Sequence, residues 1–554
     1  MGSNQEKHSR LSHRNLGVTN RIWLIVALFV SIILITHFVL PSHDLASFQP
    51  TYSNANLKAK NYLQASETKD PLPIPFDFCP AYGPRDEVGS KYGAVRLGQS
   101  RQHLGSGSRV QRVLNRALGG FPITISVIGG SISACHGSGD DPVSPKCYPS
   151  RFFQWWNTVF PHPASELTNG AMRRTDSRYF GFCSAHHMPD HTDLVIVELD
   201  TDDTSDNTSM EHFETLVRSI LNRPDSPAVI LLGHFSPQLY QAHGYAGPDH
   251  WHNIVARFYD IPHLSTKSIL LPDYIRDPSS ITKHFVDPVL ASPSGHEILS
   301  DVLIAYFQSQ TCTAWNVANG QAFDSVPILK PGTTAGDSGH LFGGVGKRKG
   351  VPESNEDIEP GLSGHSGTKE HKPIPDNILN ALQELSLVQV PKARISTRPG
   401  TGRAFEEIKP FCVSANNLIN PLPPSLFYGS GWFAHHPATS GAQNLHTTVH
   451  YWYSTHPTSK IRIPVQVGAG DIGVYYLKEP ISQIGEGSGI SCWVDDNIPG
   501  ARTIENAANI GEARPALEVI DHGVTRGSHF VECQLMGDEG QTVPMFKIMG
   551  IFST

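Results

Sequence analysis

The sequence predicts a three-layer α/β domain built on a parallel sheet, followed by a β-sandwich domain, behind an N-terminal transmembrane helix. Three observations predict this architecture. Residues 22–40 are almost entirely apolar. Between residues 76 and 312, strand-like stretches alternate with helix-like stretches, which is typical of a parallel sheet covered by helices. After Cys412, short runs follow one another with apolar residues at every second position and no helix between them, which favours a sandwich.

The apolar run at residues 22–40 predicts a membrane span. Only Ser31, Thr36 and His37 interrupt it, and as a helix it would span roughly 28 Å, close to the hydrocarbon thickness. Four Lys or Arg residues precede it, and none follows until Lys58. The positive-inside rule then places residues 1–21 in the cytosol and the later residues in the lumen of the ER or Golgi. No small-residue cleavage site follows, so we interpret the run as the signal anchor of a type II membrane protein.

The composition narrows the class of protein further. The chain has 554 residues and a formal net charge of −8, and without a basic domain we expect no nucleic-acid partner. Its eight cysteines form no Cys-x-x-Cys pair, which disfavours a zinc site and a thioredoxin-like redox site. We expect no cofactor, and no metal unless residues 200–202 hold one. An even number of cysteines suits disulfides in an oxidising compartment. A sequon at Asn207 fits a glycosylated, lumenal domain.

The elements follow in chain order. Residues 41–75 are polar, with several prolines near the end, and predict a stem. The α/β domain is predicted at residues 76–312. Its candidate strands are residues 123–130, 193–200 and 228–233, and its candidate helices are residues 150–160, 177–187, 209–222, 249–259 and 295–308.

A linker separates the two domains. Residues 329–375 are rich in Gly, Ser, Pro and charge and predict a disordered segment. Within it, residues 347–349 (Lys-Arg-Lys) are either a protease site or a solvated charge run. Residues 376–387 predict a short helix with Asp376 as its N-cap.

The β-sandwich is predicted at residues 412–554. Its candidate strands are residues 447–453, 460–467, 471–477, 489–494, 530–535 and 545–552. Such a module either binds glycans or shields the first domain. Trp432, Trp452 and Trp493 could serve as binding platforms, but most aromatic residues of this kind are expected in the core.

Two strands of the α/β domain deliver polar residues to their carboxyl ends. The first ends in Gly129-Gly130-Ser131, where the glycines allow a sharp turn and leave room around the serine. The second delivers Asp200 and Asp202. Open α/β sheets bind their ligands at this edge. The alternatives are an ordinary Gly-Gly-Ser turn and a solvated acidic loop.

With residues 169–171 (Asn-Gly-Ala) and the stretch from His284 to Leu303, these motifs line up in order and spacing with the SGNH (GDSL-type) hydrolase family. The chain most closely resembles the fungal, membrane-anchored branch of that family, which has a C-terminal β-domain. The resemblance covers residues 76–312 in its core. It implies a three-layer, flavodoxin-like α/β fold and an ester hydrolase or acyltransferase that acts on O-acyl groups of glycans.

The resemblance also implies site residues. Ser131 would be the nucleophile, an amide at Gly170 would help form the oxyanion hole, and Asp287 would orient the base. In this chemistry an imidazole takes the serine proton, and fixed donors stabilise the oxyanion.

The sequence departs from the family pattern at two of these places. Asp202 stands where the family has the asparagine of the oxyanion hole, and an ionised aspartate donates no hydrogen bond. Leu290, three residues after Asp287, stands where the family has its catalytic histidine. His284 and His296 are the candidate substitute bases, although His296 opens a helix and is expected to cap or pack there.

Three functions are therefore open. The first is an acyl esterase or acyltransferase with a degraded site. The second is a catalytically inactive pseudoenzyme with a carbohydrate-binding or scaffolding role. The third is a Golgi glycosyltransferase that holds a divalent metal through residues 200–202 (Asp-Thr-Asp), for which carboxylate oxygens are suitable ligands.

Overall fold

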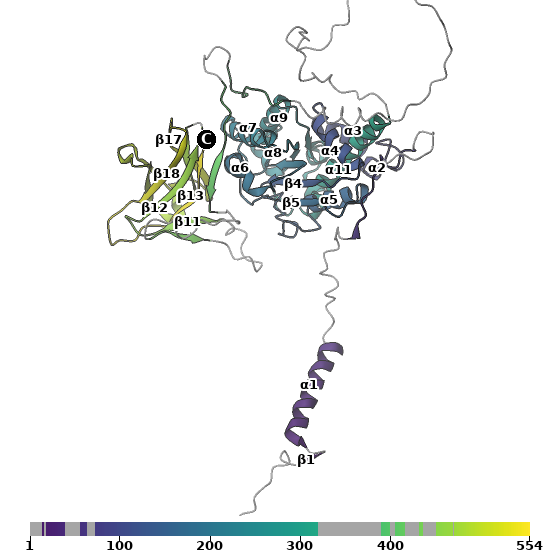
Figure 1. The fold of residues 1–554 in the computed structure, drawn as a ribbon, viewed down its shortest axis with the longest axis horizontal. Coiled ribbons are helices and arrows are strands. Elements are labelled where there is room, and N and C mark those ends of the chain that lie inside the picture. Colours follow the sequence, from purple (N-terminus) through teal and green to yellow (C-terminus); the bar gives the residue numbers. More distant parts are fainter. Residues whose placement is uncertain are drawn as a thin grey trace, which may run out of the picture. The chain divides into compact units, whose positions relative to one another are not determined.

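The computed structural model (Figure 1) describes residues 14–15, 18–38, 56–63, 73–319, 389–398, 405–415, 431–435, 450–468 and 470–554. The chain divides into two compact units, Met1–Asn56 and Leu57–Thr554. The predicted linker at residues 329–375, its Lys-Arg-Lys tract, the short helix at residues 376–387 and most of the stem lie outside the described residues.

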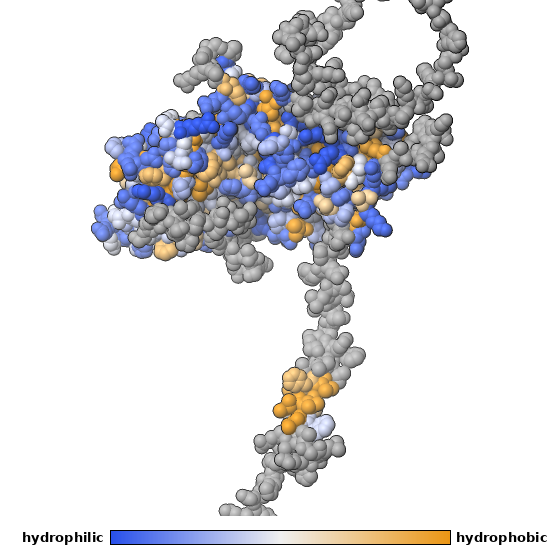
Figure 2. All heavy atoms as spheres, viewed as in Figure 1, coloured by the Kyte–Doolittle hydropathy of each residue, from blue (hydrophilic) through white to orange (hydrophobic). Residues whose placement is uncertain are grey.

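The first unit contains helix α1, Asn20–Phe38, after two short paired strands, β1 (Arg14–Asn15) and β2 (Val18–Thr19). The helix overlaps the predicted span at residues 22–40. Its residues 22–31 are exposed and form the hydrophobic band on α1 in Figure 2. In the described part of the chain, no helix satisfies the length and hydropathy needed to cross a bilayer.

The second unit begins with an α/β domain whose sheet is mostly parallel. The strand order is β3-β8-β7-β6-β4-β5, and only the edge strand β3 is antiparallel to its neighbour. The central strands are continuous buried apolar runs, as expected where helices cover both faces of a sheet. The strands are β3 (Arg101–His103), β4 (Thr124–Gly129), β5 (Glu166–Asn169), β6 (Leu194–Glu198), β7 (Ala228–Gly233) and β8 (His263–Ser265).

Helices cover both faces of this sheet. Buried side chains of α6, α7 and α9 pack with Val195 and Val197 of β6 in one core, while α4, α5 and α11 contact the sheet and one another (Figure 1). The helices are α2 (Glu87–Tyr92), α3 (Ala94–Gln99), α4 (Ser108–Leu118), α5 (Tyr148–Val159), α6 (Ser177–Cys183), α7 (Asn207–Leu221), α8 (Pro237–His243), α9 (Pro248–Phe258), α10 (Lys267–Arg276) and α11 (Pro293–Ala318).

The C-terminal domain consists of two largely antiparallel sheets that enclose one hydrophobic core. The first contains β9 (Phe411–Ser414), β10 (Phe433–His435), β11 (Tyr451–Ser454), β13 (Ile472–Pro480), β16 (Ala507–Ala508), β17 (Arg514–Asp521) and β19 (Phe546–Ser553). The second contains β12 (Lys460–Val467), β14 (Gly489–Val494), β15 (Arg502–Glu505) and β18 (Gly527–Leu535). Trp432, Trp452 and Trp493 are all buried, so they pack in the core and are not exposed platforms.

The two domains share packing. Tyr475 and Phe552 of the β domain belong to the same hydrophobic core as α6 and α7. Arg218 of α7 is almost completely buried and donates to the carbonyl oxygens of Pro391 (3.0 Å) and Ala393 (2.9 Å). The chain that leads into the β domain is therefore held against the α/β domain.

Four disulfides staple the second unit: Cys79–Cys312, Cys135–Cys147, Cys183–Cys412 and Cys492–Cys533. No cysteine is left free. Disulfides persist in oxidising compartments, so this set indicates a protein of the secretory pathway or the extracellular space.

Candidate active site

Ser131 lies two residues beyond the end of β4, and Asp202 lies four residues beyond the end of the neighbouring strand β6. The parallel strands follow the order 2-1-3-4-5 in the sheet. The chain passes from β4 to β5 on one side and then returns to β6 on the other side of β4. The carboxyl ends of β4 and β6 therefore form the switch point at which open α/β sheets bind ligands. The prediction that Ser131 lies at the carboxyl end of a strand agrees with this geometry.

The side chain of Asp202 binds Ser131 at two points. Its Oδ2 accepts the backbone N–H of Ser131 at 2.7 Å, and its Oδ1 accepts the Ser131 hydroxyl at 2.9 Å. Gly130 permits this approach, because a Cβ at that position would lie 1.9 Å from Asp202 Oδ2. The structure thus brings together Ser131, predicted as the nucleophile, and Asp202, predicted to stand at an asparagine position, in direct contact.

Burial raises the pKa of Asp202 to about 6, although the hydrogen bonds from Ser131 and Thr201 act in the opposite direction. An ordinary aspartate titrates about two units lower. The carboxyl group next to the serine therefore changes charge close to neutral pH.

A backbone amide also contacts the hydroxyl of Ser131. The backbone N–H of Arg174 donates to Ser131 Oγ at 3.0 Å. Arg174 has a φ of 52°, a left-handed conformation that is uncommon for residues other than glycine and is often found at functional sites. Sequence reasoning missed this contact because nothing in the local pattern marks Arg174.

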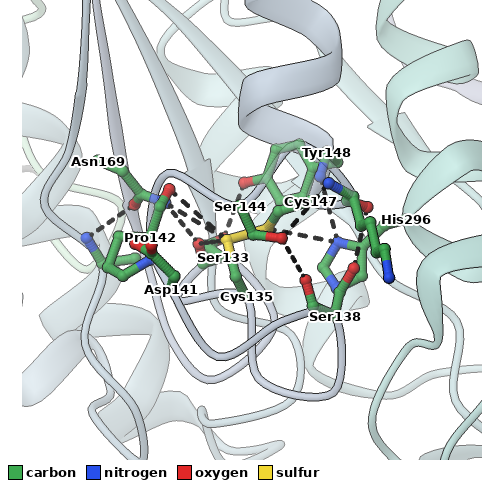
Figure 3. Close-up of a disulfide and its surroundings, with 12 residues drawn as sticks. Ser133, Cys135, Ser138, Asp141, Pro142, Ser144, Cys147, Tyr148, Asn169 and His296 are labelled. Carbon is green, nitrogen blue, oxygen red and sulfur yellow. Dashed lines mark hydrogen bonds between the residues drawn. A yellow bond between two sulfur atoms is a disulfide. The ribbon is translucent and has the colours of Figure 1, made fainter. Parts of the chain in front are cut away.

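A disulfide fixes the turn that carries the serine. Cys135 bonds to Cys147, and the side-chain amide of Asn169 donates to the carbonyl oxygens of Ser133 (2.8 Å) and Pro142 (3.0 Å), as Figure 3 shows. The segment after the nucleophile is therefore cross-linked to itself and tied to the end of β5.

Two other acids of the loop after β6, Asp200 and Asp203, bind a histidine. His252 of α9 lies between Asp200 and Asp203, with its two ring nitrogens 2.7 Å and 2.8 Å from their carboxylate oxygens. Burial alone would lower the pKa of His252, but the two carboxylates raise it to about 10, so the ring is a cation at neutral pH. Asp200 is thus engaged by His252 and Asp202 by Ser131. In the described ranges, no group of three or more metal-ligating side chains is arranged to hold an ion.

The amide predicted for the oxyanion hole is already engaged. Gly170 donates its N–H to the carbonyl oxygen of Val127 at 3.0 Å, which extends the pairing of β5 with β4. The next amide, that of Ala171, donates to Asn169 Oδ1 at 3.1 Å. Neither N–H group is available to an oxyanion in this conformation.

The last motif supplies no base to the serine. Asp287 is exposed and accepts the N–H groups of Val289 (2.7 Å) and Leu290 (2.6 Å), so it closes a local turn. His284 Nδ1 lies 2.8 Å from the Ser294 hydroxyl. Throughout the described part of the chain, no histidine side chain makes a hydrogen bond to the Ser131 hydroxyl; the contact of His136 with Ser131 is a backbone one, from its N–H to the Ser131 carbonyl oxygen at 3.1 Å.

His296 also lies in a structural position. It is completely buried, accepts the backbone N–H of Tyr148 at 3.3 Å and stacks on the Tyr148 ring (Figure 3). Burial lowers the pKa of His296 to about 3. The expectation that this histidine packs at its helix start is therefore met.

A cleft of about 780 Å³ opens beside Asp202. Its walls come from Arg174 and Thr201 of the α/β domain and from Lys478 and residues 510–517 of the β domain. The β domain thus contributes one wall of the space next to the candidate site, and the volume falls in the range of ligand-binding pockets.

The fold has solved counterparts. A two-domain esterase (CEX) active on acetylated mannans aligns with a TM-score of 0.52 and 18% identity, over 82% of this chain and 98% of that one. This similarity shows that the two chains share a fold. A second structure, of a two-domain esterase (CEX) active on acetylated mannans co-crystallised with mannopentaose, aligns over the same shares with a TM-score of 0.49 and 17% identity. An acetyl xylan esterase, AlAXEase, covers 33% of this chain with a TM-score of 0.28 and 12% identity. No protein-family model and no curated protein matches the sequence.

Proposed function

We propose that this chain is an SGNH-type serine esterase or acyltransferase that acts on O-acyl groups of glycans. The observation that carries the proposal is the position of Ser131 at the switch point of the sheet, in hydrogen-bond contact with Asp202, a carboxylate that lines a cleft. The two-domain esterase of similar fold acts on acetylated mannans, which supports an acetylated polysaccharide as the substrate.

In this function Ser131 attacks the acyl carbonyl carbon, and the sugar hydroxyl leaves. The site lacks two residues of the family pattern, since Leu290 stands at the histidine position and Asp202 at the asparagine position. Because Gly170 and Ala171 donate elsewhere, we expect slower turnover of simple esters than in a site with a complete oxyanion hole.

The second candidate is a pseudoenzyme that binds glycans without hydrolysing them. Within the described residues no imidazole makes a hydrogen bond to the Ser131 hydroxyl, which favours this candidate, as does the exposed, turn-closing position of Asp287. In that case the glycan would bind in the cleft between the domains, and its acyl groups would not be hydrolysed.

Acetate release from acetylated mannan tests the choice between these candidates. We expect the full-length protein to release acetate and Ser131→Ala to lower the rate at least about 100-fold, since losing the nucleophile leaves only residual catalysis. Ser279→Ala, at an exposed serine of the segment Pro278–His284, should change the rate less than twofold. Calorimetric binding of mannan oligosaccharides without any acetate release would favour the pseudoenzyme.

We further propose a type II membrane topology with the span at residues 22–40, a stem at residues 41–75 and lumenal domains at residues 76–312 and 412–554. The charge asymmetry around the span supports it. Asn207 is exposed at the start of α7, where an oligosaccharyltransferase could reach it.

Asn207→Gln should therefore remove an endoglycosidase-sensitive mass shift that the natural protein shows on gels. In intact vesicles, protease added from the cytosolic side should leave the domains after residue 76 uncut. Digestion of the β domain from that side would show that the orientation is the reverse.

A further inference from the structure

The two oxygens of the Asp202 carboxylate have different partners. Oδ2 accepts two hydrogen bonds, from the Ser131 N–H at 2.7 Å and from the Thr201 hydroxyl at 2.9 Å. Within the described residues, Oδ1 accepts one, from the hydroxyl of Ser131 at 2.9 Å. Oδ2 is thus held by neighbouring groups, while the hydrogen bond that Oδ1 accepts among the described residues comes from the candidate nucleophile.

The distance of 2.9 Å between Ser131 Oγ and Asp202 Oδ1 is within the range in which a general base removes a proton, about 2.6–3.2 Å between heavy atoms. We infer that Asp202 is the general base of Ser131, in place of the histidine whose position Leu290 occupies. The inference rests on the proposed function, because it assigns a catalytic residue to the esterase reaction. It also gives Asp202 a task opposite to the one that its alignment with an oxyanion-hole asparagine implies.

The environment of Asp202 suits a base that works near neutral pH. Burial raises its pKa to about 6, and proton transfer is most efficient when the pKa of the base lies near the working pH. The nearby charge of Asp176 raises the pKa of Asp202 in the same direction. Asp176 itself is paired with Arg178.

Other titratable groups lie near Asp202. Glu198 is buried at the end of β6, where it accepts the hydroxyl of Ser133, and its burial holds the pKa of its carboxyl group well above the usual range. The remaining charged residues around the cleft are Arg174, Asp206, Lys478, Glu512 and Arg514. The walls of the cleft therefore carry both positively and negatively charged side chains.

The reaction balances with water as the only co-reactant. The Ser131 hydroxyl proton moves to Asp202 Oδ1 while Oγ bonds to the acyl carbon. The carbon–oxygen bond to the sugar breaks, and the proton on Asp202 passes to the departing sugar oxygen. Water then gives its proton to Asp202 and its oxygen to the acyl carbon, which releases the carboxylic acid and restores the Ser131 hydroxyl.

The substitution Asp202→Asn separates the two tasks. Asparagine has nearly the same shape but cannot take a proton at neutral pH. If Asp202 is the base, Asp202→Asn should lower acetate release at least about 100-fold, in line with the usual contribution of general-base catalysis. If Asp202 only occupies the asparagine position, the same change restores an oxyanion-hole donor and should raise the rate.

The experiment follows acetate release from acetylated mannan, and labelling of Ser131 by a fluorophosphonate probe, with the full-length protein and its Asp202→Asn, Asp202→Glu and Asp190→Asn variants. Asp190 is exposed and outside the site, so Asp190→Asn should retain the natural rates. Asp202→Glu should keep more of both rates than Asp202→Asn, because it retains a carboxylate. The natural protein should lose rate below about pH 6, roughly tenfold per pH unit, as the base becomes protonated.

The outcomes are distinguishable. If Asp202→Asn equals or exceeds the natural protein while both remain dependent on Ser131, Asp202 is not the base, yet the proposed esterase function stands. If the natural protein neither releases acetate nor labels at Ser131, both the inference and the proposed function are overturned. Thermal unfolding of each variant shows whether a lost rate reflects a lost fold.

Discussion

His252→Leu is expected to destabilise the second unit by about 3–5 kcal/mol, the usual effect of removing one partner of a buried charge pair. Asp200 and Asp203 would lose the cation that binds both of them at 2.7 Å and 2.8 Å. The stacking of His252 on Phe213, with ring centroids 3.8 Å apart, would change as well. His250→Leu, at an exposed position of the same helix, should change the stability by less than about 0.5 kcal/mol.

The contact of His252 with Asp200 and Asp203 also predicts that the stability depends on pH. The pKa of His252 is about 10 in the folded chain and about 6.5 in an unfolded one, so the folded state retains a proton that the unfolded state releases between these values. The stabilisation is complete below about pH 6.5 and is lost as pH rises towards 10. Urea unfolding of the natural protein and of His252→Leu at several pH values measures this. An equal dependence on pH in both proteins would show that the histidine is neutral.

Gly130→Ala is the second substitution for which we expect a large effect, here on the catalytic rate. The added Cβ would lie 1.9 Å from Asp202 Oδ2 and 2.4 Å from its Cγ, so the carboxylate must leave Ser131. Acetate release and fluorophosphonate labelling should fall to the level of Ser131→Ala, at least about 100-fold, if the carboxylate is the base. The overpacking should cost about 1–3 kcal/mol of stability.

Gly98→Ala is a matched control, because a Cβ there meets no atom within 4 Å and alanine favours the helix. Its rates should equal those of the natural protein. Natural rates in Gly130→Ala as well would mean that catalysis does not need the contact between Asp202 and Ser131.

The central strands were predictable from the sequence, because β4, β6 and β7 are continuous buried apolar runs. The strands β5, Glu166–Asn169, and β8, His263–Ser265, were missed since they are short and partly polar. Residues 295–308 indicated a helix of about half the length of α11, which continues to Ala318. The extra turns bury Trp315, and such tertiary packing has no local signature.

The site was predictable only in part. The meeting of Ser131 and Asp202 follows from two neighbouring parallel strands ending at one edge. The contact of His252 with Asp200 spans 52 positions along the chain, and the helix that carries the histidine shows no pattern that would reveal it. The cysteine pairing was equally hidden, since spacing alone does not determine which of eight cysteines lie within bonding distance.

The disulfide between Cys183 and Cys412 determines what a protease cut between these two cysteines would produce. Residues 320–388 lie between these cysteines, and so does the Lys-Arg-Lys tract at residues 347–349. A protease that cuts there produces two polypeptides that migrate as one species until a reductant is added. The clamp by Arg218 on the segment around Pro391 lies on the far side of such a cut. If the tract is a protease site, its cleavage would give a covalent heterodimer of the chain's own two halves, with the walls of the cleft supplied by both.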